Sequence, residues 1–198
     1  MRHFFCGLSL LAASSALADQ VIQAEASISP QIMQNDSGYI GCGVRVLFFT
    51  IDSTSGDVSG GDFSLMLYGP PKAGGALKAG GIKCGAPCSP SDKDYVHGTD
   101  YRLSTVASGV PLKLGQPFPG DDPRFSMAVT GDIVGTVQLQ TSLIRGERVQ
   151  MAFQPDGVPA RVTYQFAANP MPKEDVEAYT SCMRAIVTKT TPDNPPAK

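Results

Sequence analysis

The cysteines of this 198-residue chain could form disulfide bonds. Cys6 lies in an apolar N-terminal segment that we expect to be removed, which leaves Cys42, Cys84, Cys88 and Cys182. An even number of cysteines in an oxidising compartment is typical of disulfide bonds, and four cysteines allow three pairings. We expect Cys84–Cys88 and Cys42–Cys182, because Gly-Ala-Pro forms a tight loop between the first two, and the other two are then left to pair.

The segment from Cys84 to Cys88 also resembles the Cys-Gly-Pro-Cys site of thioredoxins. Two residues separate the cysteines in that site, whereas three separate them here. The Ser-Pro-Ser-Asp that follows lacks the apolar periodicity of a helix that would lower the pKa of a thiol. We therefore predict a structural loop at this position and not a redox site.

His97 is the one histidine outside the N-terminal segment, and it lies near two carboxylates in the sequence. Asp94, His97 and Asp100 could in principle hold a metal ion. A structural zinc site, however, uses four Cys or His ligands, and we assign the cysteines to disulfides. The sequence therefore predicts a polar loop here, with no metal and no cofactor.

The stretch Gly-Asp-Val-Ser-Gly-Gly at 56–61 resembles the Gly-Asp-Ser-Gly-Gly around the nucleophile of trypsin-like proteases. The inserted valine breaks the match, because the backbone spacing forms the oxyanion hole. His97 also follows the serine, whereas those proteases place their histidine before it. We predict a flexible connection at 56–61 and no catalytic residue.

The charge of the chain argues against a nucleic-acid partner. Sixteen Lys and Arg residues face 18 Asp and Glu residues, and the formal net charge is −2. A mildly acidic chain is poorly suited to binding a polyanion through bulk charge.

The N-terminus has the pattern of a secretory signal. Met-Arg-His is followed by a mostly apolar run, and Ala16-Leu17-Ala18 is the small-residue sequence that a signal peptidase accepts. We expect cleavage after Ala18 and a soluble product in the periplasm or the medium. The longest later apolar stretch, 46–51, has the length of a buried strand, so we expect no transmembrane segment.

Alternating patterns predict mostly strands in the rest of the chain. Residues 20–29 alternate with period two, and Pro30 is expected to end that strand. Residues 42–51 are apolar on both faces, which indicates a central strand covered on both sides. The clearest hairpin joins 149–153 to 162–166 through Pro155-Asp156-Gly157.

Two segments favour helices. An apolar stripe follows Pro172 and includes Cys182 at its flank, so we expect a C-terminal helix that Cys42–Cys182 pins to the core. Residues 132–145 fit either a strand or a short helix ended by Gly146, and we favour the helix.

These elements predict a mainly β fold, an antiparallel β-sandwich-like domain with a disulfide-pinned C-terminal α-helix. The alternative is an α+β fold with one additional short helix near 132–145. The expected organisation is a signal peptide at 1–18, a single β-rich domain at 19–187 and a flexible tail at 188–198.

We predict a non-enzymatic module that binds a protein partner in the envelope or the extracellular space. The irregular excursion at 69–100 is the expected contact region, with Tyr95, His97 and Tyr101 at its end as the candidate contact surface. A small-ligand carrier with a β-sandwich or barrel cavity is the first alternative. A hydrolase is the second alternative.

Overall fold

The computed structural model describes residues 20–71, 73–85, 88 and 94–188. The expected signal peptide and all but the first residue of the expected tail lie outside this part of the chain. The strands are β1 (Gln20–Asn35), β2 (Gly38–Ile51), β3 (Val58–Tyr68), β4 (Gly74–Cys84), β5 (Tyr95–Val96), β6 (Gly98–Thr105), β7 (Phe118–Pro119), β8 (Ser126–Thr130), β9 (Val149–Pro155) and β10 (Val162–Ala168). The helices are α1 (Ile133–Ile144) and α2 (Lys173–Thr188).

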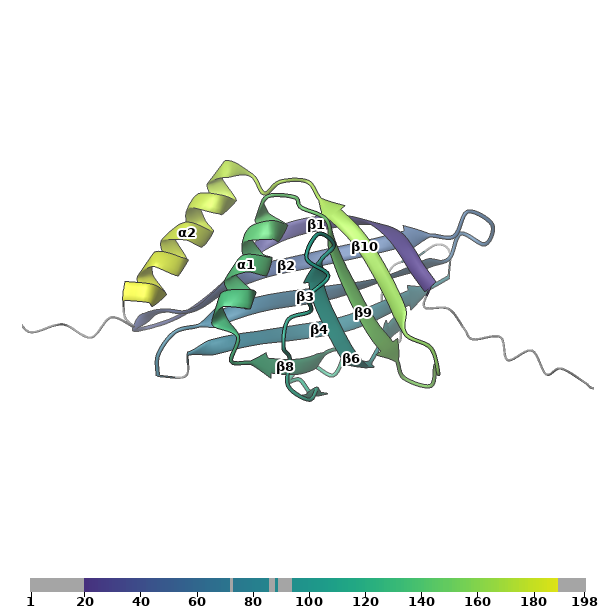
Figure 1. Ribbon diagram of the computed structural model, residues 1–198, viewed down its shortest axis with the longest axis horizontal. Coiled ribbons are helices and arrows are strands. Elements are labelled where there is room, and N and C mark those ends of the chain that lie inside the picture. Colours follow the sequence, from purple (N-terminus) through teal and green to yellow (C-terminus); the bar gives the residue numbers. More distant parts are fainter. Residues whose placement is uncertain (1–19, 72, 86–87, 89–93, 189–198) are drawn as a thin grey trace, which may run out of the picture.

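The fold is mainly β, as the sequence predicts, and its strands form one large mixed sheet. Their order is β6-β9-β10-β1-β2-β3-β4-β8-β7, and β5 pairs with β4 off this path. Neighbours are antiparallel except for β1 and β10, which run parallel from Gln20↔Val162 to Ala26↔Ala168. The sheet bends sharply at this pair, so that β6, β9 and β10 cross over β1–β4 in a sandwich-like arrangement (Figure 1).

The core lies between these two layers. Phe48, Phe63 and Phe166 are at most 2% exposed, and the rings of Phe48 and Phe166 stack with centroids 4.8 Å apart. Each large apolar side chain that is fully buried stabilises the fold by about 1.5–3 kcal/mol. The bend of the sheet is therefore held by aromatic packing between its two halves.

Both expected disulfides are present. Cys42 of β2 joins Cys182 of α2 across a Cα–Cα distance of 5.8 Å, and both residues are fully buried. Cys84, at the end of β4, joins Cys88. The first bond pins the C-terminal helix to the sheet, as the sequence predicted.

The ambiguous segment at 132–145 is a helix, so the fold has the additional helix of the alternative prediction. The Asp132 carboxylate accepts the backbone N–H of Gly135 at 2.9 Å and caps the start of α1. Gly146 follows the helix with a φ of 72°, a conformation that glycine adopts readily. The hairpin of β9 and β10 is also confirmed.

The expectation that Pro30 ends the first strand is wrong. β1 continues through Pro30, which lies opposite Val44 of β2, as far as Asn35. β10 pairs with β1 only as far as Ala26, so in the described chain the later half of β1 is an edge strand. An edge tolerates proline because its missing N–H removes no ladder hydrogen bond on the open side.

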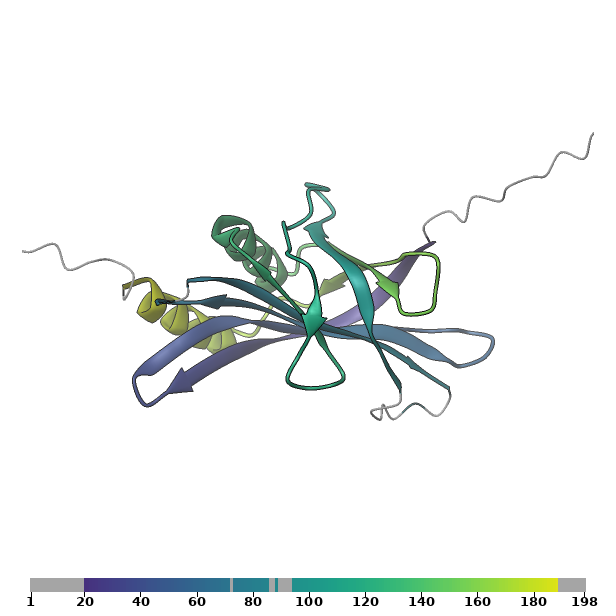
Figure 2. The same cartoon turned by 90° about the horizontal axis from the view of Figure 1, so that it is seen from below.

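The expectation that the strand at 42–51 is covered on both faces is also wrong. Val44 and Val46 are fully buried on one face of β2, but Leu47 and Ile51 on the other are 40% and 58% exposed. Both helices lie on the same side of β1–β4, and the loop between β7 and β8 projects from the other (Figure 2). We call the side of β1–β4 that faces away from the helices the outer face.

Candidate interaction surface

A cluster of paired charges occupies the centre of the outer face. Strand register places Arg45 of β2 opposite Ser64 of β3, and Ser64 opposite Lys78 of β4. Asp62 lies two residues before Ser64 and therefore points to the same face. The ladder thus brings two cationic side chains and one carboxylate onto three adjacent strands.

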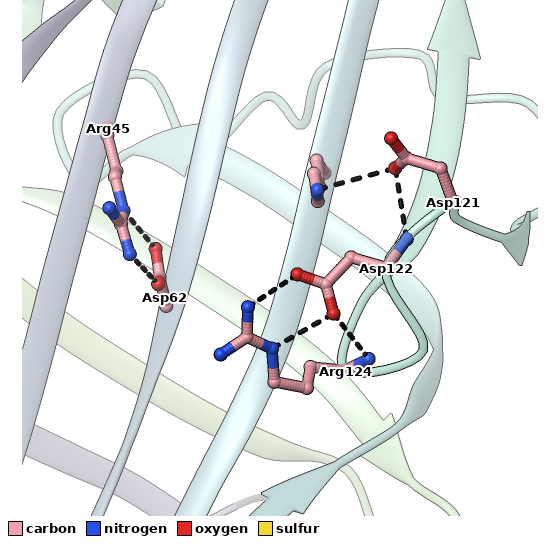
Figure 3. Close-up of polar contacts among 6 residues, drawn as sticks. Arg45, Asp62, Asp121, Asp122 and Arg124 are labelled. Carbon is pink, nitrogen blue, oxygen red and sulfur yellow. Dashed lines mark hydrogen bonds and ion pairs between the residues drawn. The ribbon is translucent and has the colours of Figure 1, made fainter. Parts of the chain in front are cut away.

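Asp62 is a buried carboxylate that Arg45 neutralises. The Arg45 Nε and Nη2 groups donate to the two carboxylate oxygens at 3.0 and 2.5 Å, a bidentate pair (Figure 3). The side chain of Asp62 is 2% exposed and that of Arg45 is 52% exposed. The hydrogen bond to Asp62 raises the pKa of Arg45 above its usual value. Arg45 therefore stays charged, and the half of its side chain that does not contact Asp62 is exposed to solvent.

Gly80 explains how Asp62 becomes buried. Gly80 lies opposite Asp62 in the register of β3 and β4. A Cβ atom at Gly80 would lie 2.6 Å from the backbone oxygen of Arg124 and 3.2 Å from the rings of Phe125 and Tyr95. The loop between β7 and β8 therefore rests directly on the bare backbone of Gly80 and covers Asp62.

This loop carries its own charge pairs. The Arg124 guanidinium donates to both carboxylate oxygens of Asp122 at 2.9 and 2.6 Å, and this contact holds the pKa of Asp122 well below its usual range (Figure 3). The ammonium of Lys78 lies 3.5 Å from the Asp121 carboxylate. Three cations and three carboxylates are thus matched over a small area.

Aromatic rings lie among these charges. The ring centroids of Tyr95 and Phe125 are 5.4 Å apart. The Arg124 guanidinium lies 5.4 Å from the centroid of Tyr95, and Lys78 Nζ lies 4.8 Å from that of Phe125, both within cation–π range. A hollow of about 220 Å³ opens between these side chains and the Arg45–Asp62 pair.

A second hollow, of about 270 Å³, adjoins the first. Its lining includes Met33, Met66, Tyr68 and Met127, and it shares Lys78 with the first hollow. Methionine side chains are flexible and polarizable, and they adapt to irregular partners. The two hollows together give the outer face a groove with one charged half and one apolar half.

Exposed apolar side chains lie on the same face of the sheet as this groove. Among the described residues, twelve large hydrophobic side chains are exposed, and strand alternation places half of them on the outer face. These six are Val21, Met33, Leu47, Ile51, Phe118 and Val129. Exposed apolar side chains gathered on one face with polar residues between them are typical of a contact surface.

The structure separates the three residues of the predicted contact surface. Tyr95 lies half-buried in the outer-face cluster, and His97 is exposed at the bend between β5 and β6. Tyr101 is 6% exposed, and its hydroxyl lies 3.4 Å from the Ala79 carbonyl oxygen, to which it donates. Tyr101 therefore does not reach the surface. Of the predicted contact region, residues 72, 86–87 and 89–93 lie outside the described chain.

The polar loop predicted around His97 is wrong, because the residues on both sides of it form β5 and β6. The Asp100 carboxylate forms ion pairs with Arg161 and, at 3.2 Å, with Arg102. These two arginines, and not His97, are its partners. The flexible connection predicted at 56–61 is wrong from Val58 onward, because β3 begins there, and Ser59 lies within this strand and not on an exposed turn. Within the described ranges, no group of three or more His, Cys, Asp or Glu side chains could hold a metal ion.

Sequence reasoning missed the pairing of Arg45 with Asp62 and the loop at 120–125. A usable signal was present, because Asp62 is the only charged residue of its strand. Such an acid is rarely buried without a cation, and Arg45 is the cation on the neighbouring strand.

Comparisons with models of protein families, with curated proteins and with solved structures found no match. No helix in the described part of the chain is long and apolar enough to cross a bilayer. The two disulfides are consistent with a location outside the cytoplasm.

Proposed function

We propose that this protein is a non-enzymatic interaction module that binds a protein partner through its outer face. The observation that carries the proposal is the open face of the sheet, where exposed Met33 lines the groove of paired charges and aromatic rings, and exposed Leu47, Phe118 and Val129 lie opposite its lining residues in the strand register. Tyrosine, arginine and methionine are enriched in protein interfaces, and Tyr and Arg are frequent energetic hot spots.

The pairing of the charges favours a protein contact. A charge that must lose its water on binding is costly unless a partner already compensates it. Arg45, Lys78 and Arg124 each have a carboxylate partner on the same face. Another protein can therefore cover the outer face without leaving an isolated charge, and the exposed apolar side chains of the same face supply the hydrophobic contribution.

The place of action in this proposal is the bacterial periplasm or the medium. Residues 1–18 have the pattern of a secretory signal, with cleavage after Ala18, and the remaining four cysteines all form disulfides. Disulfides persist in oxidising compartments, so the covalent framework fits an exported product.

Site-specific photo-crosslinking in the native envelope fraction tests the proposal. A photoreactive residue at Leu47, on the outer face, is compared with one at Val134 on α1, which is apolar and even more exposed at 66%. We expect one discrete protein adduct at Leu47 and none of that mass at Val134. Leu47→Asp should abolish the same adduct captured from a photoreactive residue at Met33, at an unchanged melting temperature.

Two results would contradict this function. Equal adducts at Leu47 and Val134 would show that capture follows exposure and not the outer face. Recovery of a small molecule without a protein partner would favour a carrier.

A further inference from the structure

A cleft of about 630 Å³ opens between the two layers of the folded sheet, at the end of the molecule away from the disulfide to α2. Its walls come from both layers, and most of the inward-facing side chains are apolar. They include Ile22, Val96, Phe153, Val158, Val162 and Tyr164. The volume falls within the range of roughly 300–1,000 Å³ that is usual for small-molecule sites.

The cleft is shaped by a glycine at its base and by a hydrogen-bonded loop at its rim. A Cβ atom at Gly81 would lie 3.0 Å from the Phe153 ring, so the missing side chain lets β9 approach β4 closely at the base of the cleft. At the rim, the Asp52 carboxylate accepts the backbone N–H groups of Thr54 and Ser55, both at 2.8 Å. The rim is thus held in place before any ligand arrives, which lowers the entropic cost of binding.

Three of the polar groups of the cleft lie on one row of the sheet. Thr50, Ser59 and Lys83 are opposite one another in the register of β2, β3 and β4, and all three line the cleft. Lys83 is exposed and has no ion-pair partner among the described residues. Asp52, the one carboxylate of the lining, already accepts hydrogen bonds from its own loop. The mouth therefore offers an unpaired cation beside two hydroxyl groups.

We propose that this cleft binds a small amphipathic carboxylate. The apolar body of the ligand lies between Phe153, Val162 and Val96, and its carboxylate pairs with the Lys83 ammonium at the mouth. Val158 is 42% exposed at the cleft, and an apolar ligand would cover it. The polar row of this site points away from the outer face, because Thr50, Ser59 and Lys83 alternate with the outer-face positions of the same strands. Ile51, at the end of β2, borders both surfaces.

Dodecanoate below its micellar concentration is the probe, with dodecanol as its uncharged match. The chain contains no tryptophan, so Val158→Trp supplies a single fluorescent reporter at the cleft. We expect saturable quenching or a spectral shift with dodecanoate. Lys83→Ala in the same background should weaken dodecanoate binding by at least about tenfold and leave dodecanol binding unchanged. Lys78→Ala, on the outer face, should change neither.

A variant that fills the cleft provides an independent measurement. Val162→Trp places a large side chain in the cleft and should abolish the heat of dodecanoate binding in calorimetry, with a retained cooperative melting transition as the check of folding. The proposal is overturned if dodecanoate does not bind, or if Lys83→Ala weakens dodecanol as much as dodecanoate. Lys83-dependent binding to anionic vesicles without binding of monomeric dodecanoate would also overturn it, because the occupant would then be a lipid surface.

Discussion

The hydroxyl of Tyr179 on α2 donates to Oε1 of Gln140 on α1 across 2.8 Å, next to the disulfide that joins α2 to the sheet. Gln140 is fully buried, and its Nε2 group donates to the backbone oxygens of Leu65 at 2.9 Å and Cys42 at 3.3 Å. One side chain thus connects both helices to β2 and β3. A buried polar network whose members are all satisfied fixes the relative placement of the elements that it joins.

Removing the side-chain amide of Gln140 should destabilise the fold more than removing the hydroxyl of Tyr179. Gln140→Leu leaves the Tyr179 hydroxyl and the two carbonyl oxygens without this partner, and we expect a loss of about 2–4 kcal/mol in the free energy of unfolding. Tyr179→Phe leaves one amide oxygen unpaired and should cost about 1–2 kcal/mol. Urea denaturation measures both. Gln138→Leu, an exposed glutamine on the same helix, should stay within about 0.5 kcal/mol of wild type.

The same tyrosine predicts a loss of stability in alkali. Burial raises the pKa of Tyr179 to about 12, whereas the unfolded chain releases this proton near the usual value of about 10. The contribution of the protonated phenol to stability is therefore complete below about pH 10, and it is lost as the pH rises through about 12. The loss is at most about 3 kcal/mol.

Denaturation by urea between pH 9 and 12 checks this dependence. Stability should fall over that range, and the fall should be shallower in Tyr179→Phe than in wild type. An identical slope in the two proteins would show that other groups, and not this phenol, control alkaline unfolding.

The two disulfides should differ in their contribution to stability. Cys42–Cys182 closes a loop over a sequence separation of 140 residues, whereas Cys84–Cys88 spans a separation of 4. The chain-entropy model gives about 5 kcal/mol for the long loop and about 2 kcal/mol for the short one. We expect a much larger fall in melting temperature when both Cys42 and Cys182 become Ala than when Cys84 and Cys88 do. Equal losses would contradict these roles.

Local patterns in the sequence were sufficient for much of the fold. Period-two alternation identified β9 and β10, and the turn residues Asp156 and Gly157 identified their connection. The Cys42–Cys182 pairing followed from the tight Cys84–Cys88 loop, which left the other two cysteines to pair. These features depend on residues close together in the chain, and tertiary packing agreed with them.

The candidate surface could not be derived in the same way. Leu47 and Ile51 have the residue types of a buried strand, and their exposure follows from both helices packing on the other side of β2. Tyr95 and Tyr101 are near in sequence, but β5 pairs with β4 while β6 pairs with β9, so the two rings are in different environments. Which face of a strand is covered is a property of the assembled layers and not of its own sequence.

Removing one member of the Arg45–Asp62 pair should lower the stability of the fold more than replacing both members with apolar residues. Arg45→Ala leaves a buried carboxylate without its cation, and we expect a loss of about 1–3 kcal/mol, because the guanidinium is half exposed and screened by solvent. Arg45→Met combined with Asp62→Leu should recover most of this loss, since an apolar pair has no charge to desolvate. Urea denaturation of the single and double variants measures the difference.

A surface ion pair provides the comparison for this prediction. Arg102 lies 3.2 Å from Asp100, and both side chains are substantially exposed. Arg102→Ala should cost less than about 1 kcal/mol. If Arg45→Ala lowers the free energy of unfolding as little as Arg102→Ala does, the buried Asp62 carboxylate does not need Arg45 for its stability.

Gly80→Ala should disturb the outer face at its base. The new Cβ would lie 2.6 Å from the Arg124 carbonyl oxygen, which is backbone, so the loop over Asp62 must move outward. We expect a loss of about 1–3 kcal/mol and faster trypsin cleavage after Arg124. Gly131→Ala is the matched control, because a Cβ there meets nothing within 4 Å, and cleavage should match wild type. Equal cleavage in both variants would mean that the loop does not rest on Gly80 in solution.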